Sequence, residues 1–88
     1  MPYIDMEEVR RIVEDQVRSE FRMQHPLAIL DRIEITSMNM RGVADKRVCN
    51  VQGYAVHNYI ESYNVVSERI DFYAQVNVYT ASIKRFRM

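Results

Sequence analysis

The chain has 88 residues, 48% of them hydrophobic and 27% charged, and its 12 basic and 12 acidic side chains give a formal net charge of +0. These proportions are typical of a folded globular domain, and the neutral charge excludes electrostatic attraction as the main way of binding nucleic acid or an anionic membrane. A single cysteine, Cys49, excludes an internal disulfide and cannot alone form a structural zinc site. We expect one domain over residues 1–88 that does not enter a membrane, and we expect it in the cytoplasm because the charged N-terminus is unlike a secretion signal.

The first segment has the period of an amphipathic helix. Its apolar positions recur every three or four residues, at Met6, Val9, Val13, Val17 and Phe21. Asp5 stands at the N-cap position, and Glu8 follows three residues later as in a capping box. Pro26 disfavours helical geometry in the residue before it. The pattern therefore predicts a helix over about residues 5–23.

After Pro26 the apolar period becomes alternating, which predicts strands over about residues 30–40, 47–59, 68–79 and 83–88. The expected loops are residues 41–46, residues 61–67 and the turn Thr80-Ala81-Ser82. In the first strand Met38 differs in parity from Ile35, so either a bulge near Ser37 restores the phase or the strand's end is covered on its other face. The order of elements predicts an α+β fold, with one N-terminal helix packed on an antiparallel meander of about four strands.

This order resembles the cystatin-like arrangement, in which a curved sheet wraps one helix. The cystatins that inhibit proteases carry the motif Gln-x-Val-x-Gly in a hairpin. The nearest stretch here is Val48-Cys49-Asn50-Val51-Gln52-Gly53, which has Cys49 where the glutamine should stand. The resemblance therefore implies a topology, and it carries no protease inhibition to this chain.

The two middle strands predict a polar, aromatic and nearly uncharged sheet face on the side away from the helix. Cys49, Val51, Gly53 and Ala55 would face the helix and leave the alternate positions outside. The predicted partner-binding residues on the outer face are Gln52, Tyr54, Val56, Tyr73, Gln75, Asn77 and Tyr79. Tyrosines and amides are typical of protein-contact surfaces, although cross-strand pairs of the same residues also stabilise a solvated sheet.

We therefore predict a non-catalytic protein-interaction module, not an enzyme, that uses this face or an open strand edge. Its expected partner is a protein or a second copy of the chain, as in a homodimer, an adaptor or a small inhibitor. A chain of this size has little room for a deep pocket beside its core.

The first alternative is a ligand-binding or enzymatic domain with a shallow site near His57. This histidine lies close to Tyr59 in sequence and is predicted to reach Asp71 across the strand pair, and a general base needs such a carboxylate. A lone histidine in a strand is more often packed or solvated, and the helix dipole suffices to explain His25. No metal-ligand spacing occurs, so we expect no catalytic residue, no metal and no cofactor.

The second alternative is single-stranded nucleic-acid binding through the basic run Lys84-Arg85-Phe86-Arg87, with Phe86 stacking on a base. The neutral total charge argues against it, and protection of an edge strand by Lys and Arg explains the same residues. We do not expect nucleic acid as a partner. Cys49 is interpreted as a small buried hydrophobe and not as a reactive thiol.

Overall fold

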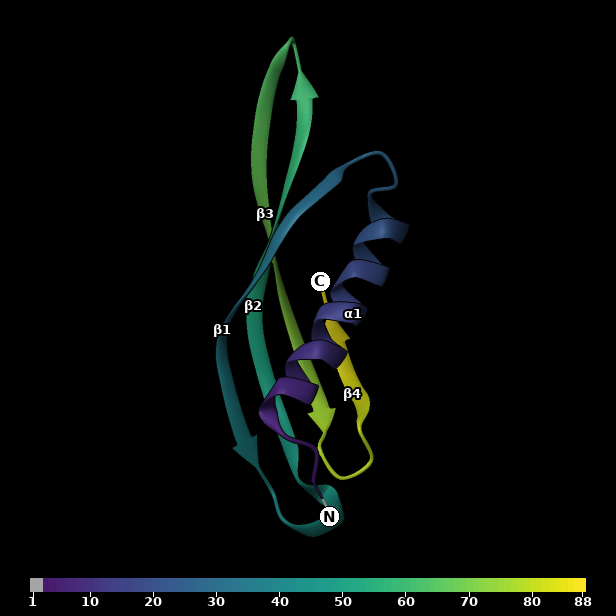
Figure 1. Cartoon of the computed structure of the whole chain (residues 1–88), viewed down its shortest axis with the longest axis vertical. Coiled ribbons are helices and arrows are strands. Elements are labelled where there is room, and N and C mark those ends of the chain that lie inside the picture. The colour runs from purple at the N-terminus through teal and green to yellow at the C-terminus, as the bar shows by residue number, and fades with distance from the viewer. Residues whose placement is uncertain (1–2) are drawn as a thin grey trace.

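The computed structural model describes residues 3–88 and contains one long helix on a four-stranded sheet (Figure 1). The elements in chain order are α1 (Met6–Gln24), β1 (Ile29–Arg41), the short 3-10 helix η1 (Ala44–Lys46), β2 (Val48–Glu61), β3 (Asn64–Asn77) and β4 (Ser82–Arg87). The strand order is β1-β2-β3-β4 and every neighbouring pair is antiparallel. The predicted α+β class, helix on an antiparallel meander, is confirmed.

Helix α1 begins where its sequence signal indicated. The Asp5 carboxylate accepts a hydrogen bond from the Glu8 backbone N–H at 2.8 Å, so a free N–H of the first turn is satisfied. The apolar stripe is buried against the sheet at Val9, Val13, Val17 and Phe21. None of the helices within residues 3–88 is long and apolar enough to cross a membrane.

The sheet has the predicted phase. Side chains of alternate residues on β2 and β3 point toward α1 and form the core, and the buried ones are Cys49, Val51, Ala55, Phe72, Ala74 and Val76. Strand β1 joins the same core with an irregularity between Ile35 and Ser37, after which Met38 packs inward. The bulge that was one of two hypotheses for this strand is therefore confirmed, because Thr36 is the extra residue that restores the phase.

Gly53 is required by close packing between neighbouring strands and not by the approach of α1. A Cβ atom at this position would lie 2.2 Å from the Glu34 carbonyl oxygen and 2.8 Å from Cζ of Phe72. The bulge of β1 brings its backbone over Gly53, while the Phe72 ring covers the same spot from β3. Glycine has no Cβ atom, so the Glu34 carbonyl and the Phe72 ring can both lie at this position.

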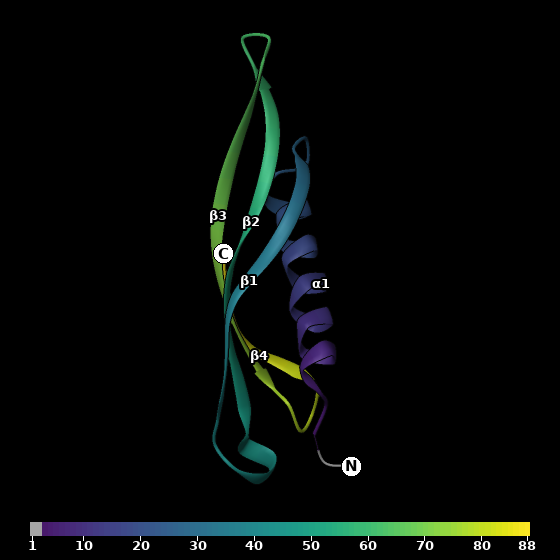
Figure 2. The same ribbon diagram turned by 60° about the vertical axis from the view of Figure 1, so that its left-hand side comes forward.

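The hairpin of β2 and β3 extends well beyond the rest of the molecule (Figure 2). The molecule measures 53 × 21 × 18 Å along its principal axes, and the hairpin forms one end of the long axis. The loop expected over residues 61–67 is wrong, because Glu61 pairs with Asn64 and only Ser62 and Tyr63 connect the strands. Strand β3 consequently starts four residues earlier than the sequence indicated, at Asn64 instead of residue 68.

Candidate functional site

The outer face of the sheet carries a network of amide and tyrosine side chains. The Asn50 side-chain oxygen accepts hydrogen bonds from the Tyr73 hydroxyl at 3.1 Å and from the Gln75 amide at 2.9 Å. Gln52 lies beside Tyr73 in register and is exposed. These hydrogen bonds link the side chains of β2 and β3 across the face.

Arginines from the strands and strand ends lie over the two central tyrosines of this face. The Arg69 guanidinium lies 4.4 Å from the centroid of the Tyr54 ring, and the Arg87 guanidinium lies 5.2 Å from that of Tyr73. The prediction of a nearly uncharged face is therefore wrong. It considered the middle of β2 and β3, whereas Arg69 and Arg87 reach the face from the distal part of β3 and from β4.

Two of the predicted contact residues are buried within the fold. Val56 is 9% exposed. Its register partners on the two neighbouring strands are Arg32 and Arg69, whose long aliphatic stems can cover it. Asn77 is 7% exposed. Its side chain donates to the Asp45 carbonyl at 2.9 Å and accepts from the backbone N–H groups of residues 79 and 80, each at 2.9 Å.

Asn77 therefore builds the turn between β3 and β4. That turn spans residues 78–81, not Thr80-Ala81-Ser82, because the amide oxygen closes it two and three residues after Asn77. Tyr79, in this turn, is half exposed and meets the Tyr3 ring edge to face at 6.4 Å. The predicted residues Gln52, Tyr54, Tyr73 and Gln75 thus lie together on the outer face, while Tyr79 lies apart at the end of the sheet.

His57 lies on the helix side of β2, next to Glu68 and not next to Asp71. The two residues are register partners, with Nε2 of His57 3.8 Å from a Glu68 carboxylate oxygen. Asp71 pairs with Tyr54 instead, so the predicted contact between His57 and Asp71 is wrong. The Tyr59 hydroxyl donates a 2.6 Å hydrogen bond to the same Glu68 carboxylate, which raises the pKa of Tyr59 to about 12.

Aromatic rings enclose His57 on the helix side. Its ring centroid lies 5.3 Å from that of His25 and 5.4 Å from that of Phe21, and its Nδ1 is buried without a hydrogen-bond partner within residues 3–88. We call His25, His57, Tyr59 and Glu68 the His57 cluster. No group of side chains suited to a metal ion occurs in this part or elsewhere in the described chain.

The edge of β3 is open along the projecting hairpin. Strand β4 pairs with β3 from Tyr73 to Asn77, and in residues 3–88 no strand covers the stretch Asn64–Phe72 on the side away from β2. Ile60 and Val65, a cross-strand pair near the tip, are 78% and 72% exposed. Tyr63 at the tip is fully exposed. This end of the molecule thus combines unpaired backbone with apolar side chains, a combination that favours strand addition.

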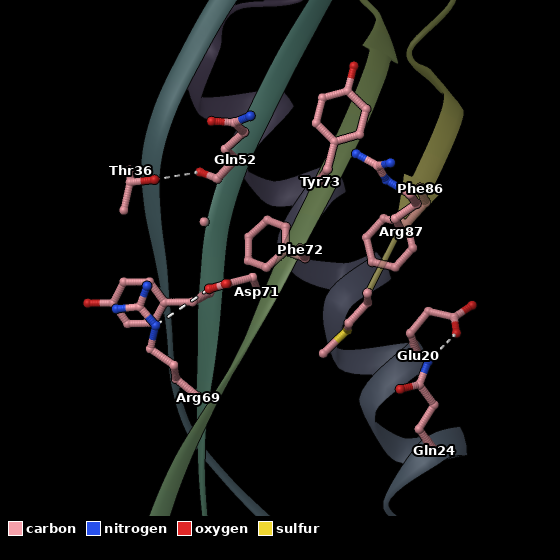
Figure 3. Close-up of a pocket in the computed structure, with 13 residues that line it drawn as sticks. Glu20, Gln24, Thr36, Gln52, Arg69, Asp71, Phe72, Tyr73, Phe86 and Arg87 are labelled. Atoms are coloured by element: carbon pink, nitrogen blue, oxygen red, sulfur yellow. Dashed lines mark hydrogen bonds and ion pairs between the residues drawn. The ribbon is translucent and has the colours of Figure 1, made fainter.

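A groove of about 910 Å³ lies where β4 ends beside β3 (Figure 3). We call it the β3–β4 groove. Its apolar side chains are Phe72, Phe86 and Met88, and its charged ones include Arg69, Asp71, Arg87 and Glu20 of α1. The groove adjoins the open edge of β3, so a strand that added to this edge would reach it.

The remaining candidates from the sequence have structural roles. Cys49 is fully buried and burial raises the pKa of its thiol, so its interpretation as a small hydrophobe is confirmed. Phe86 packs toward the core, which removes the stacking aromatic from the basic run of β4. The sequence predicted an open strand edge without saying which, and the tip was missed, because Ser62-Tyr63 lacks the Asn-Gly or Asp-Gly signal of a tight hairpin.

Comparisons with family models, with curated proteins and with solved structures gave no match to this chain.

Proposed function

We propose that the protein is a non-catalytic interaction module whose partner adds a strand to the open edge of β3. The observation that carries this proposal is the uncovered stretch Asn64–Phe72 beside exposed Ile60, Tyr63 and Val65. Unpaired strand edges supply regular backbone hydrogen bonds to a partner, and alternate side chains supply the selectivity. The outer face around Tyr54 and Tyr73 continues from this edge and gives the partner aromatic and arginine contacts.

The other open edges of the sheet are less suited to a partner. Strand β1 is interrupted by two irregularities, between Leu30 and Arg32 and between Ile35 and Ser37. Strand β4 is short and carries Lys84 and Arg85. Bulges, short strands and basic side chains are the devices that keep an edge unpaired, so the open edge of β3 is the favoured one.

The test is a proline at Ser67, in the middle of the open edge. Proline removes a backbone N–H that an added strand needs, and Ser67→Ala is the matched control because it removes only the hydroxyl that donates to Asn58 at 2.7 Å. We expect wild type and Ser67→Ala to self-associate in sedimentation or to retain a protein from an extract of the native host, and Ser67→Pro to do neither while it keeps its fold. Equal behaviour of all three variants contradicts the proposal.

A small-ligand site at the His57 cluster is the second candidate. It is favoured by the buried Nδ1 of His57, which has no partner within residues 3–88, and by the short bond between Tyr59 and Glu68 beside it. A ligand there should raise the melting temperature of the wild type and not that of His57→Ala. The idea fails if no compound of a broad library changes the melting temperature of the wild type.

The topology leaves a cystatin-like affiliation as a proposal that rests on element order alone. A cytoplasmic location is likewise a proposal.

A further inference from the structure

The tip of the hairpin has a backbone conformation that its residues do not favour. Ser62 has φ of 50° and Tyr63 has φ of 67°, the left-handed geometry that a type I′ hairpin turn has at both central positions. Asn-Gly satisfies this geometry without strain, whereas a serine and a tyrosine do not. Because the Tyr63 side chain is fully exposed, packing within its own fold offers no compensation. The tip thus displays an aromatic ring at a cost in folding stability.

The register determines which backbone groups of β3 are free. Arg47 and Val78 lie just outside the paired strands, next to the pair Val48 and Asn77. The Val78 N–H donates to the Arg47 carbonyl at 3.1 Å, so this pair continues the register of β2 and β3. Even-numbered residues of β3 therefore bond to β2, and odd-numbered residues direct their N–H and C=O groups to the other side. Along the open edge these free residues are Val65, Ser67, Arg69 and Asp71.

We propose that this edge pairs antiparallel with the same edge of a second copy of the chain, with Ser67 on the two-fold axis. Tyr63 of each copy then enters the β3–β4 groove of the other copy. The inference rests on the proposed function, because it names the partner that adds to the open edge of β3.

Symmetry and the position of β4 select this register. A two-fold axis perpendicular to the sheet places the helix-side faces of both copies on the same side of the joined sheet. Only residues of equal parity therefore lie opposite one another. With Ser67 on the axis, Val65 lies opposite Arg69 of the second copy and Asn64 lies opposite its Ile70. The tip then falls beside Asp71 and Phe72 of the second copy, at the mouth of the groove. A register shifted further toward the C-terminal end of β3 would place the tip of one copy against Tyr73 of the other. The backbone of Tyr73 is already paired with Arg87 of β4.

The charges along this pairing are compatible with two identical strands. Glu68 lies opposite Val66 of the second copy, and Arg69 lies opposite its Val65, so like charges do not face each other directly. The formal net charge of +0 leaves no overall repulsion between copies. The groove offers the partly exposed Phe86 and Met88 to the Tyr63 ring, and its charged side chains offer partners for the phenol hydroxyl.

The first experiment locates the axis with a cysteine in place of Ser67. Residues of a hydrogen-bonded antiparallel pair have Cα atoms about 5.5 Å apart, a separation that a disulfide can span. We expect Ser67→Cys to form a covalent dimer under mild oxidation, and Ser19→Cys, exposed on α1, to remain monomeric under the same conditions. The wild type is the second control because its Cys49 is fully buried. Crosslinking of Val66→Cys without crosslinking of Ser67→Cys overturns the register.

The second experiment separates the contact of Tyr63 from the stability of the hairpin. Tyr63→Gly relieves the left-handed φ at the tip, so its melting temperature should rise at concentrations where the wild type and the variant are both monomeric. Its dimer dissociation constant in sedimentation should nevertheless rise at least about tenfold, as expected when a central aromatic contact is truncated. Tyr79→Ala, at the other end of the sheet, should leave dimerisation unchanged. Unaltered dimerisation of Tyr63→Gly overturns the tip contact.

The two proposals fail differently. A wild type that stays monomeric at high concentration overturns the second copy as partner. If that monomer still retains another protein that Ser67→Pro does not retain, the interaction through the open edge of β3 stands. If it retains none, the proposed function fails as well.

Discussion

Replacement of Gly53 by alanine tests whether the bulge of β1 and the Phe72 ring determine this position. The new Cβ atom would lie 2.2 Å from the Glu34 carbonyl oxygen, 2.8 Å from Cζ of Phe72 and 3.0 Å from Cα of Ile35. The Phe72 ring can rotate slightly, but two of the three contacts are with the backbone of β1, which the pairing with β2 holds in place. The strand must therefore move outward at its bulge.

The expected cost follows from two opposing terms. Overpacking of a well-packed region costs about 1–3 kcal/mol in free energy of unfolding. We expect a cost at the upper end of this range here, because the contact is with backbone atoms that cannot rotate away. Alanine recovers about 0.5–1 kcal/mol because it restricts the unfolded chain more than glycine does. The net loss in free energy of unfolding is about 2 kcal/mol. For a domain of this size it corresponds to a fall in melting temperature of about 8–16 °C.

Urea unfolding of Gly53→Ala and of the wild type measures this loss directly. Gln52→Ala is the matched control, since it changes the neighbouring, exposed position on the same strand and should alter stability by less than about 0.5 kcal/mol. The midpoint of Gly53→Ala should fall with little change in the slope of the transition. A variant as stable as the wild type would show that the β1 backbone does not constrain this position, and the reasoning would be refuted.

Three further predictions concern single interactions. The hydrogen bond to Glu68 raises the pKa of Tyr59 to about 12, so the folded protein should lose stability as the pH rises from about 10 to 12, and Glu68→Gln should lose less over that range; ultraviolet titration of the phenol gives the pKa, and urea unfolding across this pH range measures the loss of stability. Asn77→Ala removes the acceptor of the turn before β4 and should cost about 1–3 kcal/mol in thermal unfolding. Asp5→Ala removes the helix N-cap and should cost about 1 kcal/mol.

The controls for these changes use neighbouring positions. Glu61→Gln should leave the alkaline titration of Tyr59 nearly unchanged, because the Glu68 hydrogen bond is its largest cause. Thr80→Ala should cost less than Asn77→Ala, because the Thr80 backbone N–H still bonds to Asn77. Glu7→Ala changes an exposed residue of the first turn and should cost less than Asp5→Ala. Equal losses within any pair would contradict the assigned contact.

The sequence was sufficient to predict the division of the sheet into two faces. Alternation of small and apolar residues on β2 and β3 assigns each side chain to a face whatever the loop lengths are, and Phe72 and Val76 are indeed buried. The helix could be located because Asp5 and its apolar stripe are local signals. The bulge of β1 was recognisable from the change of parity between Ile35 and Met38.

The pairing of individual residues across β2 and β3 could not be predicted. It depends on the length of the connection, and Ser62-Tyr63 carries no tight-turn signal. A longer loop would place Asp71 opposite His57, whereas the two-residue turn places Glu68 there. One wrong loop therefore moved the carboxylate of the candidate site and concealed the open edge of β3. The structural role of Asn77 was missed for a different reason, since its bond to Asp45 joins residues distant in sequence and its bonds to residues 79 and 80 form in a turn that the sequence placed at Thr80-Ala81-Ser82.

The unequal strand edges also limit how large an assembly can grow. A molecule with two receptive edges could add copies without end and form fibrils, as flat edges do in aggregating proteins. Within residues 3–88, the irregularities in β1 and the short, basic β4 make those edges less suited to an added strand than the distal part of β3. In the proposed dimer each copy pairs this part of β3 with the other, so no such edge is left for a third copy and the sheet stops at two chains. Concentrated solutions should therefore neither gel nor bind amyloid dyes.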